Sequence, residues 1–128
     1  MILLDTCTLL WLAAEPASLS QRAREVLASH HGRLFVSAIS AFEVSIKHHK
    51  GRLTLPSEPA EWFTRALEFH GLLEIPVNGR IAALSTSLPP LHTDPCDRLI
   101  VATAAIHGLT VLTPDPLIRG YPQLSSSW

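Results

Sequence analysis

The chain has 128 residues with a formal net charge of −1 at pH 7, and only 16% of its residues are charged. This length allows one domain, residues 1–128. No apolar run reaches the ~18 residues that a membrane span needs. The first apolar run also has no basic residues before it, so it does not have the pattern of a secretory signal. The near-neutral net charge excludes the general surplus of basic residues that many nucleic-acid-binding proteins have. The fraction of charged residues is low against an average near ~25%. It predicts an apolar surface that is buried in an oligomer or a complex.

The first predicted element is a strand at the N-terminus. Residues 2–4 are an uninterrupted apolar run that ends at Asp5, the pattern of a strand buried on both faces of its sheet. Three further strands are predicted, at residues 33–36, 72–77 and 109–113. Helices are predicted between them, at residues 7–14, 21–29, 37–50, 59–70, 79–87 and 99–107.

The last of these helices has a distinct opening, with Thr93 or Asp94 as the N-cap and Pro95 just inside. The tail, residues 116–128, shows no pattern of a long element. Strands that alternate with helices in this way predict an α/β fold, in which three layers, α/β/α, are built on a mainly parallel sheet.

Carboxylates are placed where such a sheet binds ligands. Asp5 and Asp115 follow predicted strands, and open parallel sheets bind their ligands at the carboxyl ends of their strands. Asp94 and Asp97 are three residues apart, so both lie on one side of the first turn of their helix. Glu43 lies next to the apolar stripe of helix 37–50, where an isolated charge is costly and needs a partner. We therefore expect these carboxylates to converge.

A cluster of carboxylates needs positive charge between its members. The chain has only two lysines, both near the end of helix 37–50, so we expect a divalent cation in the cluster. Oxygen ligands without a spaced set of histidines or cysteines favour Mg²⁺ or Mn²⁺ over Zn²⁺, and such an ion activates water and neutralises a phosphodiester. Taken singly, each residue also has a structural interpretation: Asp94 as an N-cap, Asp97 as a partner of the helix dipole, Asp115 as a turn residue and Glu43 as a member of an ion pair.

Four acidic segments follow one another along the chain. They are Leu3-Leu4-Asp5-Thr6, residues 36–44 around Glu43, residues 92–102 around Asp97, and Leu112-Thr113-Pro114-Asp115. These segments resemble the four acidic motifs of PIN-domain proteins, and most of all those of the VapC-type toxins of bacterial toxin–antitoxin modules. The third segment, with its Asp-Pro-Cys-Asp-Arg core, is the most specific. Where the family usually has an aromatic residue in this segment, the chain has Cys96.

The resemblance implies a PIN-like fold and a Mg²⁺- or Mn²⁺-dependent endoribonuclease that hydrolyses RNA with a metal-activated water. By motif position, Asp5, Glu43 and Asp97 would be the core metal-binding and catalytic carboxylates, and Asp115 would be the fourth. Three further residues would support them, and these are Thr6, Asp94 and Thr113. The resemblance also implies a cognate protein antitoxin and a homodimer. The alternative is a catalytically degenerate PIN-like module that binds metal or RNA without cleaving it.

Basic residues cluster around the end of helix 37–50. With a net charge of −1, the chain would have to hold RNA through a local patch, because phosphate contacts by Lys and Arg supply most of the affinity for nucleic acid. We predict that this patch consists of Lys47, Lys50, Arg52 and Arg98. Complementation of the helix dipole explains the residues at the helix end equally well.

The two cysteines, Cys7 and Cys96, form no CxxC pair, which favours a reducing compartment and therefore the cytoplasm. Each lies within two residues of a predicted catalytic aspartate. Inhibition of the site by thiol oxidation or by a soft metal is therefore a hypothesis that thiol-directed reagents would test.

Overall fold

The sheet at the centre of the molecule has five strands, and all of its pairings are parallel. In this computed structural model, which describes residues 1–128, the strands are β1 (Ile2–Leu4), β2 (Leu34–Ser37), β3 (Leu72–Ile75), β4 (Thr110–Leu112) and β5 (Ser126–Ser127). Their order across the sheet is β3-β2-β1-β4-β5. The central strand is therefore β1, and its Leu4 lies beside Val36 of β2 and Leu112 of β4.

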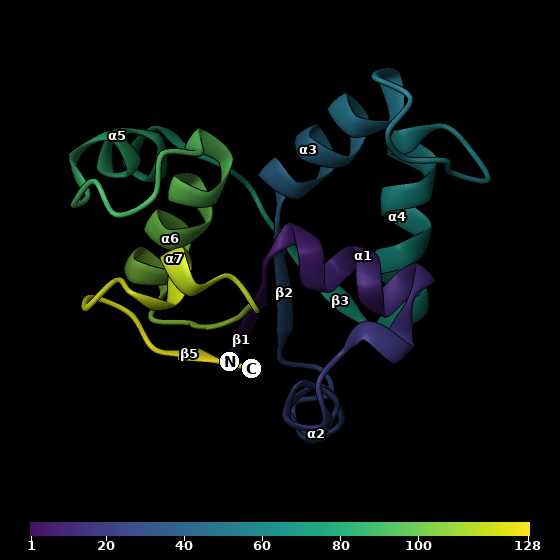
Figure 1. The fold of residues 1–128 in the computed structure, drawn as a ribbon, viewed down its shortest axis with the longest axis horizontal. Helices are drawn as coiled ribbons and strands as arrows, with labels where there is room; N and C mark the ends of the chain where they lie inside the picture. The colour runs from purple at the N-terminus through teal and green to yellow at the C-terminus, as the bar shows by residue number, and fades with distance from the viewer.

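Helices cover both faces of this sheet. They are α1 (Thr6–Ala14), η1 (Pro16–Ser18, a 3₁₀ helix), α2 (Gln21–Ser29), α3 (Ala38–His49), α4 (Pro59–His70), α5 (Gly79–Ser87), α6 (Pro95–His107) and α7 (Pro116–Arg119). Figure 1 shows α1, α3 and α4 on one side of the sheet and α5, α6 and α7 on the other. None of the helices is both long and apolar enough to cross a membrane.

The sheet divides the core into two apolar clusters. Ile2 and Leu4 of β1 belong to one cluster, with side chains from α1, α2, α3 and α4. Leu3 belongs to the other, with side chains from α5, α6 and α7. Alternate residues of a strand point to opposite faces, and all three of these side chains are at most 4% exposed. The predicted strand buried on both faces and the predicted α/β/α fold are confirmed.

The C-terminal tail differs from the prediction. It contains the short helix α7 and the edge strand β5, where the Thr113 N–H donates to the Ser127 carbonyl at 3.1 Å. A strand of two serines carries no apolar signal, so the prediction of four strands missed it. The third strand is also shorter than predicted. It ends at Ile75 because Pro76 has no N–H to donate to the ladder.

Candidate active site

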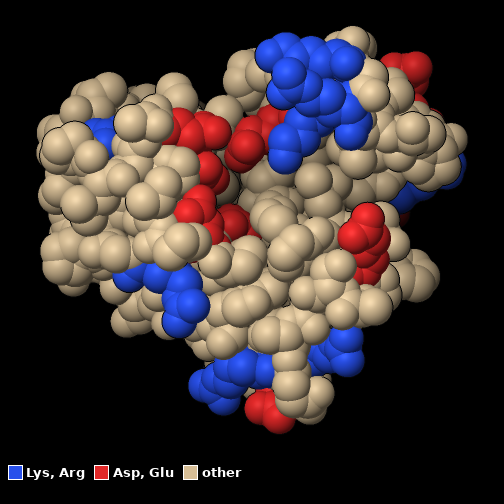
Figure 2. Space-filling model, in the orientation of Figure 1, with Lys and Arg blue, Asp and Glu red and all other residues tan.

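An acidic cavity of 360 Å³ opens at the carboxyl edge of the sheet. Figure 2 shows the acidic atoms gathered in a hollow between the two halves of the molecule, with a basic cluster beside it. The cavity is lined by Asp5, Thr6, Cys7, Glu43, Lys47, Asp94, Asp97, Pro114, Asp115 and Pro116. The four carboxylates predicted as metal ligands thus lie together, with Asp94 and a single lysine, Lys47.

The parallel sheet explains why these distant residues meet. Asp5 directly follows β1, and Asp115 lies three residues beyond the end of its neighbour β4. Glu43 comes from α3, which begins directly after β2, the other neighbour of β1. Asp97 lies in the first turn of α6, on the opposite face of the sheet. Because the strands are parallel, the chain segments that leave their carboxyl ends all emerge at one edge.

Asp5 is a buried carboxylate that two hydrogen bonds hold in place. Its side chain is only 3% exposed. One oxygen, Oδ1, accepts the Thr8 N–H at 2.8 Å and so caps α1, and the other, Oδ2, accepts the Thr113 hydroxyl. Burial raises the pKa of Asp5, and the hydrogen bonds from Thr113 and Thr8 oppose this rise. No lysine or arginine forms an ion pair with it, so the carboxylate is oriented but not neutralised.

Glu43 is fixed from across the cavity by the first helix. The Thr6 hydroxyl donates to Oε1 of Glu43 at 2.6 Å and lies 2.9 Å from the Ser40 hydroxyl. Burial raises the pKa of Glu43, the Thr6 hydrogen bond lowers it, and repulsion from Asp94 raises it further. The ion-pair interpretation of Glu43 is wrong, because no Lys or Arg nitrogen lies within ion-pair distance of it.

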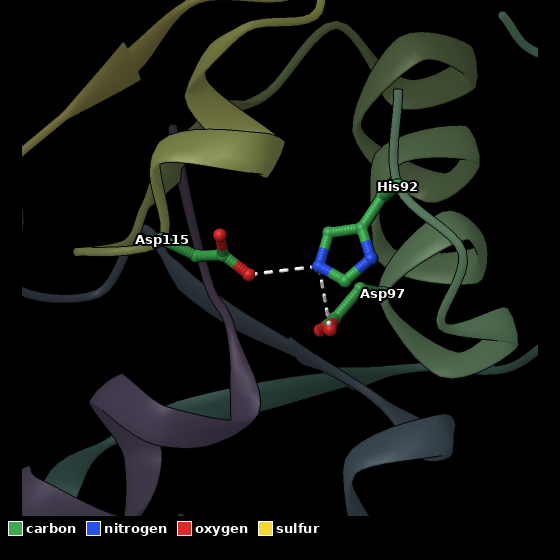
Figure 3. A group of neighbouring side chains, drawn as sticks. All are labelled: His92, Asp97 and Asp115. Atoms are coloured by element: carbon green, nitrogen blue, oxygen red, sulfur yellow. Dashed lines mark hydrogen bonds and ion pairs between the residues drawn. The ribbon is translucent and has the colours of Figure 1, made fainter. Parts of the chain in front are cut away.

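Asp97 and Asp115 are joined by a histidine. The His92 Nε2 lies 2.8 Å from Oδ2 of Asp115 and 3.1 Å from Oδ2 of Asp97 (Figure 3). Burial, followed by repulsion from Glu43 and Asp94, raises the pKa of Asp97 to about 7, and His92 acts in the opposite direction. The structure has one group of three histidine and acidic side chains whose ligand atoms lie close enough together to hold a metal ion, and it consists of His92, Asp97 and Asp115.

The sequence prediction missed His92. The sequence has no spaced set of histidines, and His92 is isolated in it. Its side chain is nevertheless among the buried polar groups of the molecule. The available signal was its position two residues before Asp94, inside the segment that also carries Asp97.

Asp94 acts as the N-cap of α6. Its Oδ1 accepts the Cys96 N–H at 2.8 Å and the Asp97 N–H at 3.4 Å. Asp115 caps α7 in the same way, because its Oδ1 accepts the Leu117 N–H at 2.8 Å. Both residues still line the acidic cavity, so a cap and a place in the site are compatible.

The acidic segments all fall within one family match. The model of the PIN domain family matches residues 2–122. The chain belongs to the PIN-domain family.

Relatives of this PIN domain match it over almost its whole length. Ribonuclease VapC22 of Mycobacterium tuberculosis is 33% identical over 121 residues, which are 94% of this chain and 91% of that protein. Among solved structures, FitAcB from Neisseria gonorrhoeae is similar at 26% identity and a TM-score of 0.64, over 98% of this chain and 96% of that one. A toxin–antitoxin complex from Klebsiella pneumoniae matches at 24% identity and a TM-score of 0.65, over 97% and 95%.

The predicted RNA-binding residues of the PIN domain fall into two groups. Lys47, Lys50 and Arg52 line a second cavity of 190 Å³, and Lys47 also lines the acidic one. Glu43 and Asp94 are common to both cavities, so the basic cluster is continuous with the carboxylates. In Figure 2 the basic atoms gather over the end of α3.

Arg98 does not line this second cavity, and its role as an RNA-binding residue stays a prediction. Its guanidinium donates to five acceptors, the carbonyls of Ser85, Leu88, Pro89 and His92 and the hydroxyl of Tyr121, at 2.9 to 3.4 Å. A guanidinium has five N–H donors. Nε and both hydrogens of Nη1 are engaged, whereas Nη2 donates one of its two hydrogens, to the Leu88 carbonyl. Arg98 therefore stabilises the loop between α5 and α6 and keeps one N–H of Nη2 for a further acceptor.

The two cysteines of the PIN domain are half-buried and free. Burial raises the pKa of Cys7 to about 11 and that of Cys96 to about 12, and neighbouring carboxylates add to both shifts. Because the thiolate is the reactive form, these shifts oppose the hypothesis that the two thiols are readily oxidised at neutral pH.

Proposed function

We propose that residues 1–128 form one PIN-like nuclease domain, a divalent-metal-dependent endoribonuclease that serves as the toxin of a type II toxin–antitoxin pair. The observation that carries this proposal is the convergence of Asp5, Glu43, Asp97 and Asp115, from four separate segments, on one cavity with a single lysine. Membership of the PIN family and the relative named Ribonuclease VapC22 support the reaction class.

The chemistry of the donor set fits a Mg²⁺ or Mn²⁺ ion. All four side chains present carboxylate oxygens, the ligands that these hard cations prefer. Burial is the main cause that raises the pKa values of Asp5, Glu43 and Asp97, and repulsion from neighbouring carboxylates adds to each rise. A cation among these groups would relieve both costs. Asp5, Glu43, Asp97 and Asp115 would hold the ion. When bound, it would lower the pKa of a coordinated water and stabilise negative charge on the phosphodiester.

The remaining residues around the cavity orient these groups. Thr113 holds Oδ2 of Asp5, and Thr6 holds Oε1 of Glu43, so neither carboxylate can rotate without breaking a hydrogen bond. Asp94 fixes the start of α6 and thereby the position of Asp97. In the proposal these three residues, Thr6, Asp94 and Thr113, support the ligands and are not themselves ligands.

Lys47, Lys50 and Arg52 would bind the RNA backbone beside the reacting phosphate. Their cavity shares Glu43 and Asp94 with the acidic one, so a strand bound there reaches the carboxylates directly. The overall charge of −1 leaves this cluster as the local source of attraction for phosphate. Complementation of the dipole of α3 by the same residues is compatible with this role.

We also propose a protein antitoxin, a homodimer and a location in the cytoplasm. The similar chain from Klebsiella pneumoniae was solved as a toxin–antitoxin complex, which supports the first of these. Large apolar side chains that remain exposed, such as Phe42 at 54% and Phe69 at 85%, support contact with other chains. The absence of a disulfide between Cys7 and Cys96 is consistent with a reducing compartment.

The proposal is tested with purified protein that has been separated from any bound partner. We expect cleavage of single-stranded RNA in Mg²⁺ or Mn²⁺, no cleavage in EDTA, and loss of cleavage in Asp5→Asn and Asp97→Asn. Glu25→Gln, on the exposed face of α2, is the matched control and should cleave like the parent. Cleavage that survives both aspartate substitutions would refute the proposal. Binding of metal or RNA without cleavage in the parent would instead indicate a degenerate module.

A further inference from the structure

The ring of His92 is held in one tautomer by the backbone. The Asp94 N–H donates to Nδ1 of His92 at 3.1 Å, so Nδ1 must offer its lone pair. In a neutral imidazole one nitrogen accepts and the other carries the hydrogen. The hydrogen of the neutral ring therefore lies on Nε2, the atom that faces Asp97 and Asp115 (Figure 3).

The loop that carries His92 is itself anchored on both sides of the residue. The His92 N–H donates to the Tyr121 hydroxyl at 3.1 Å, and the His92 carbonyl accepts from Nη1 of Arg98 at 3.1 Å. Tyr121 is 1% exposed, and His92 is 8% exposed. Backbone contacts thus fix the position of the ring independently of its contacts with the carboxylates.

His92 is the one side chain that contacts the carboxylates of both Asp97 and Asp115 through a hydrogen bond or an ion pair. Asp115 comes from the segment after β4, and Asp97 comes from α6, so the two carboxylates belong to separate elements. Their Oδ2 atoms both lie within 3.1 Å of Nε2. Nε2 forms a hydrogen bond with Oδ2 of Asp115 at 2.8 Å and an ion-pair contact of 3.1 Å with Oδ2 of Asp97. A positively polarised N–H beside two negatively charged oxygens offsets part of their mutual repulsion.

We infer that His92 is a positioning residue, whose Nε2–H keeps the carboxylates of Asp97 and Asp115 side by side at the acidic cavity, where a divalent cation would bind. It is not a metal ligand itself, because coordination through Nε2 would need a lone pair there and would break the hydrogen bond from Asp94 to Nδ1. Partners that orient metal-binding carboxylates typically contribute a factor of about 10–100 to metal affinity or activity. The consequence for RNA cleavage rests on the proposed function, whereas the consequence for metal binding does not.

Substitutions that separate the two ring nitrogens test this inference. In His92→Gln the side-chain amide nitrogen takes the place of Nε2 and can still donate to the carboxylates. In His92→Asn the amide reaches only the position of Nδ1. His92→Ala removes both positions. Calorimetric titration of each protein with Mn²⁺ and with Mg²⁺, in the absence of RNA, measures the effect on the site alone.

We expect the affinity for both ions to fall by the same factor, about 10–100-fold, in His92→Ala and His92→Asn. His92→Gln should retain an affinity within a few-fold of the parent, a rescue that a purely structural role would not produce. Thermal unfolding in EDTA shows which variants are folded, and if His92→Ala is not, the comparison of Gln with Asn decides. Tyr121→Phe, which removes only the hydroxyl bound to the loop, is the control for a general loosening of that loop.

Three results would overturn the inference. One is unchanged affinity in a folded His92→Ala or His92→Asn variant. Another is a His92→Gln variant as weak as His92→Asn, because the donor would then be irrelevant. The third is a loss confined to Mn²⁺ while Mg²⁺ binding is kept, which would make His92 a nitrogen ligand. If the parent binds Mn²⁺ with the expected dependence on His92 but cleaves no RNA, the proposed function fails and this inference stands.

Discussion

Substitutions of Asp5 can distinguish a loss of catalysis from a loss of stability, because the two oxygens of its carboxylate have different partners. Oδ1 caps α1 through the Thr8 N–H, and Oδ2 accepts the hydroxyl of Thr113. Asp5→Asn keeps an oxygen for the cap and replaces the second oxygen with a nitrogen. Asp5→Ala removes both. The two variants should therefore differ in stability, although both lose the negative charge that a cation needs.

The structure sets the expected magnitudes. Asn and Asp are about equally good N-caps, whereas Ala at an N-cap costs about 1 kcal/mol. In Asp5→Asn the new N–H₂ group can donate to Oγ1 of Thr113, which already accepts the Asp115 N–H at 3.0 Å. The Thr113 hydrogen is then left without its acceptor, at a cost of about 1 kcal/mol. Removal of a carboxylate whose pKa is raised by burial offsets this cost, so Asp5→Asn should lie within about 1 kcal/mol of the parent.

Asp5→Ala should be less stable than Asp5→Asn by about 1–3 kcal/mol, because it removes the cap and leaves the buried Thr113 hydroxyl without a side-chain partner. For a domain of this size that difference is about 3–10 °C in Tm. Thermal unfolding in EDTA measures it. RNA cleavage should fall by more than about 100-fold in both variants, since even indirect partners of a metal contribute about 10–100-fold.

Two outcomes would refute this reasoning. Cleavage by a folded Asp5→Asn protein at the level of the parent would show that the charge of Asp5 is not required at the site. Equal loss of stability in the Asn and Ala variants would show that the cap on α1 does not depend on Oδ1 of Asp5. The Glu25→Gln protein provides the reference for both measurements, because this residue is exposed on α2.

The remaining predictions address the cation, the proton, the basic cluster and the loop. Mn²⁺ at 100 times its Kd should stabilise the parent against urea by about 2.7 kcal/mol, and EDTA should abolish the effect. Asp97 in the folded protein has a pKa of about 7, against an ordinary value of 3.8. Between these values the ion-free native state binds a proton that the unfolded state does not, so its stability should fall as pH rises from 4 to 7. The urea midpoints measured at the two ends of this range should differ less in Asp97→Asn than in the parent. Lys47→Glu and Lys50→Glu together, made in the Asp97→Asn background, should weaken RNA binding in a fluorescence anisotropy assay. They should also lower the salt slope of that binding by roughly 0.7 for each phosphate that is no longer neutralised. In the same assay, Arg22→Glu on α2 should change neither quantity. Arg98→Met should lower the free energy of unfolding by at least about 3 kcal/mol, because each acceptor left unpaired costs about 1–3 kcal/mol, and equal urea midpoints for variant and parent would contradict the loop-stabilising role.

The convergence of the acidic residues was predictable from local patterns and one rule of topology. Residues 2–4 are apolar without interruption, which is the pattern of a central parallel strand. Once the sheet is parallel, residues that follow its strands must meet at one edge, and this brings Asp5 and Asp115 together. Their roles as metal ligands stay predictions, because they depend on an interaction with a cation and not on the fold.

What the sequence could not show depends on partners that are remote in the chain. Arg98 follows Asp97 in the motif, so its charge suggested a phosphate contact. Its actual partners are the Ser85 carbonyl at the end of α5, three carbonyls of the loop that follows, and the hydroxyl of Tyr121. The role of His92 depends in the same way on Asp115, which lies 23 residues away. Propensity and periodicity carry no information about such pairs, whereas they do locate strands and caps.

The site reconciles the gathering of like charges with a stable fold by using backbone N–H groups. The Oδ1 atoms of Asp5, Asp94 and Asp115 each accept an N–H from the first turn of the helix that they cap. Partial positive charge at a helix start stabilises a carboxylate there, so the fold offsets part of the repulsion before any cation binds. The same bonds turn the second oxygen of Asp5 towards Thr113 and that of Asp115 towards His92. Substitution by Asn should therefore preserve the caps at all three positions while it removes the charge. At the two proposed ligands, Asp5 and Asp115, the cost should appear in cation binding rather than in folding.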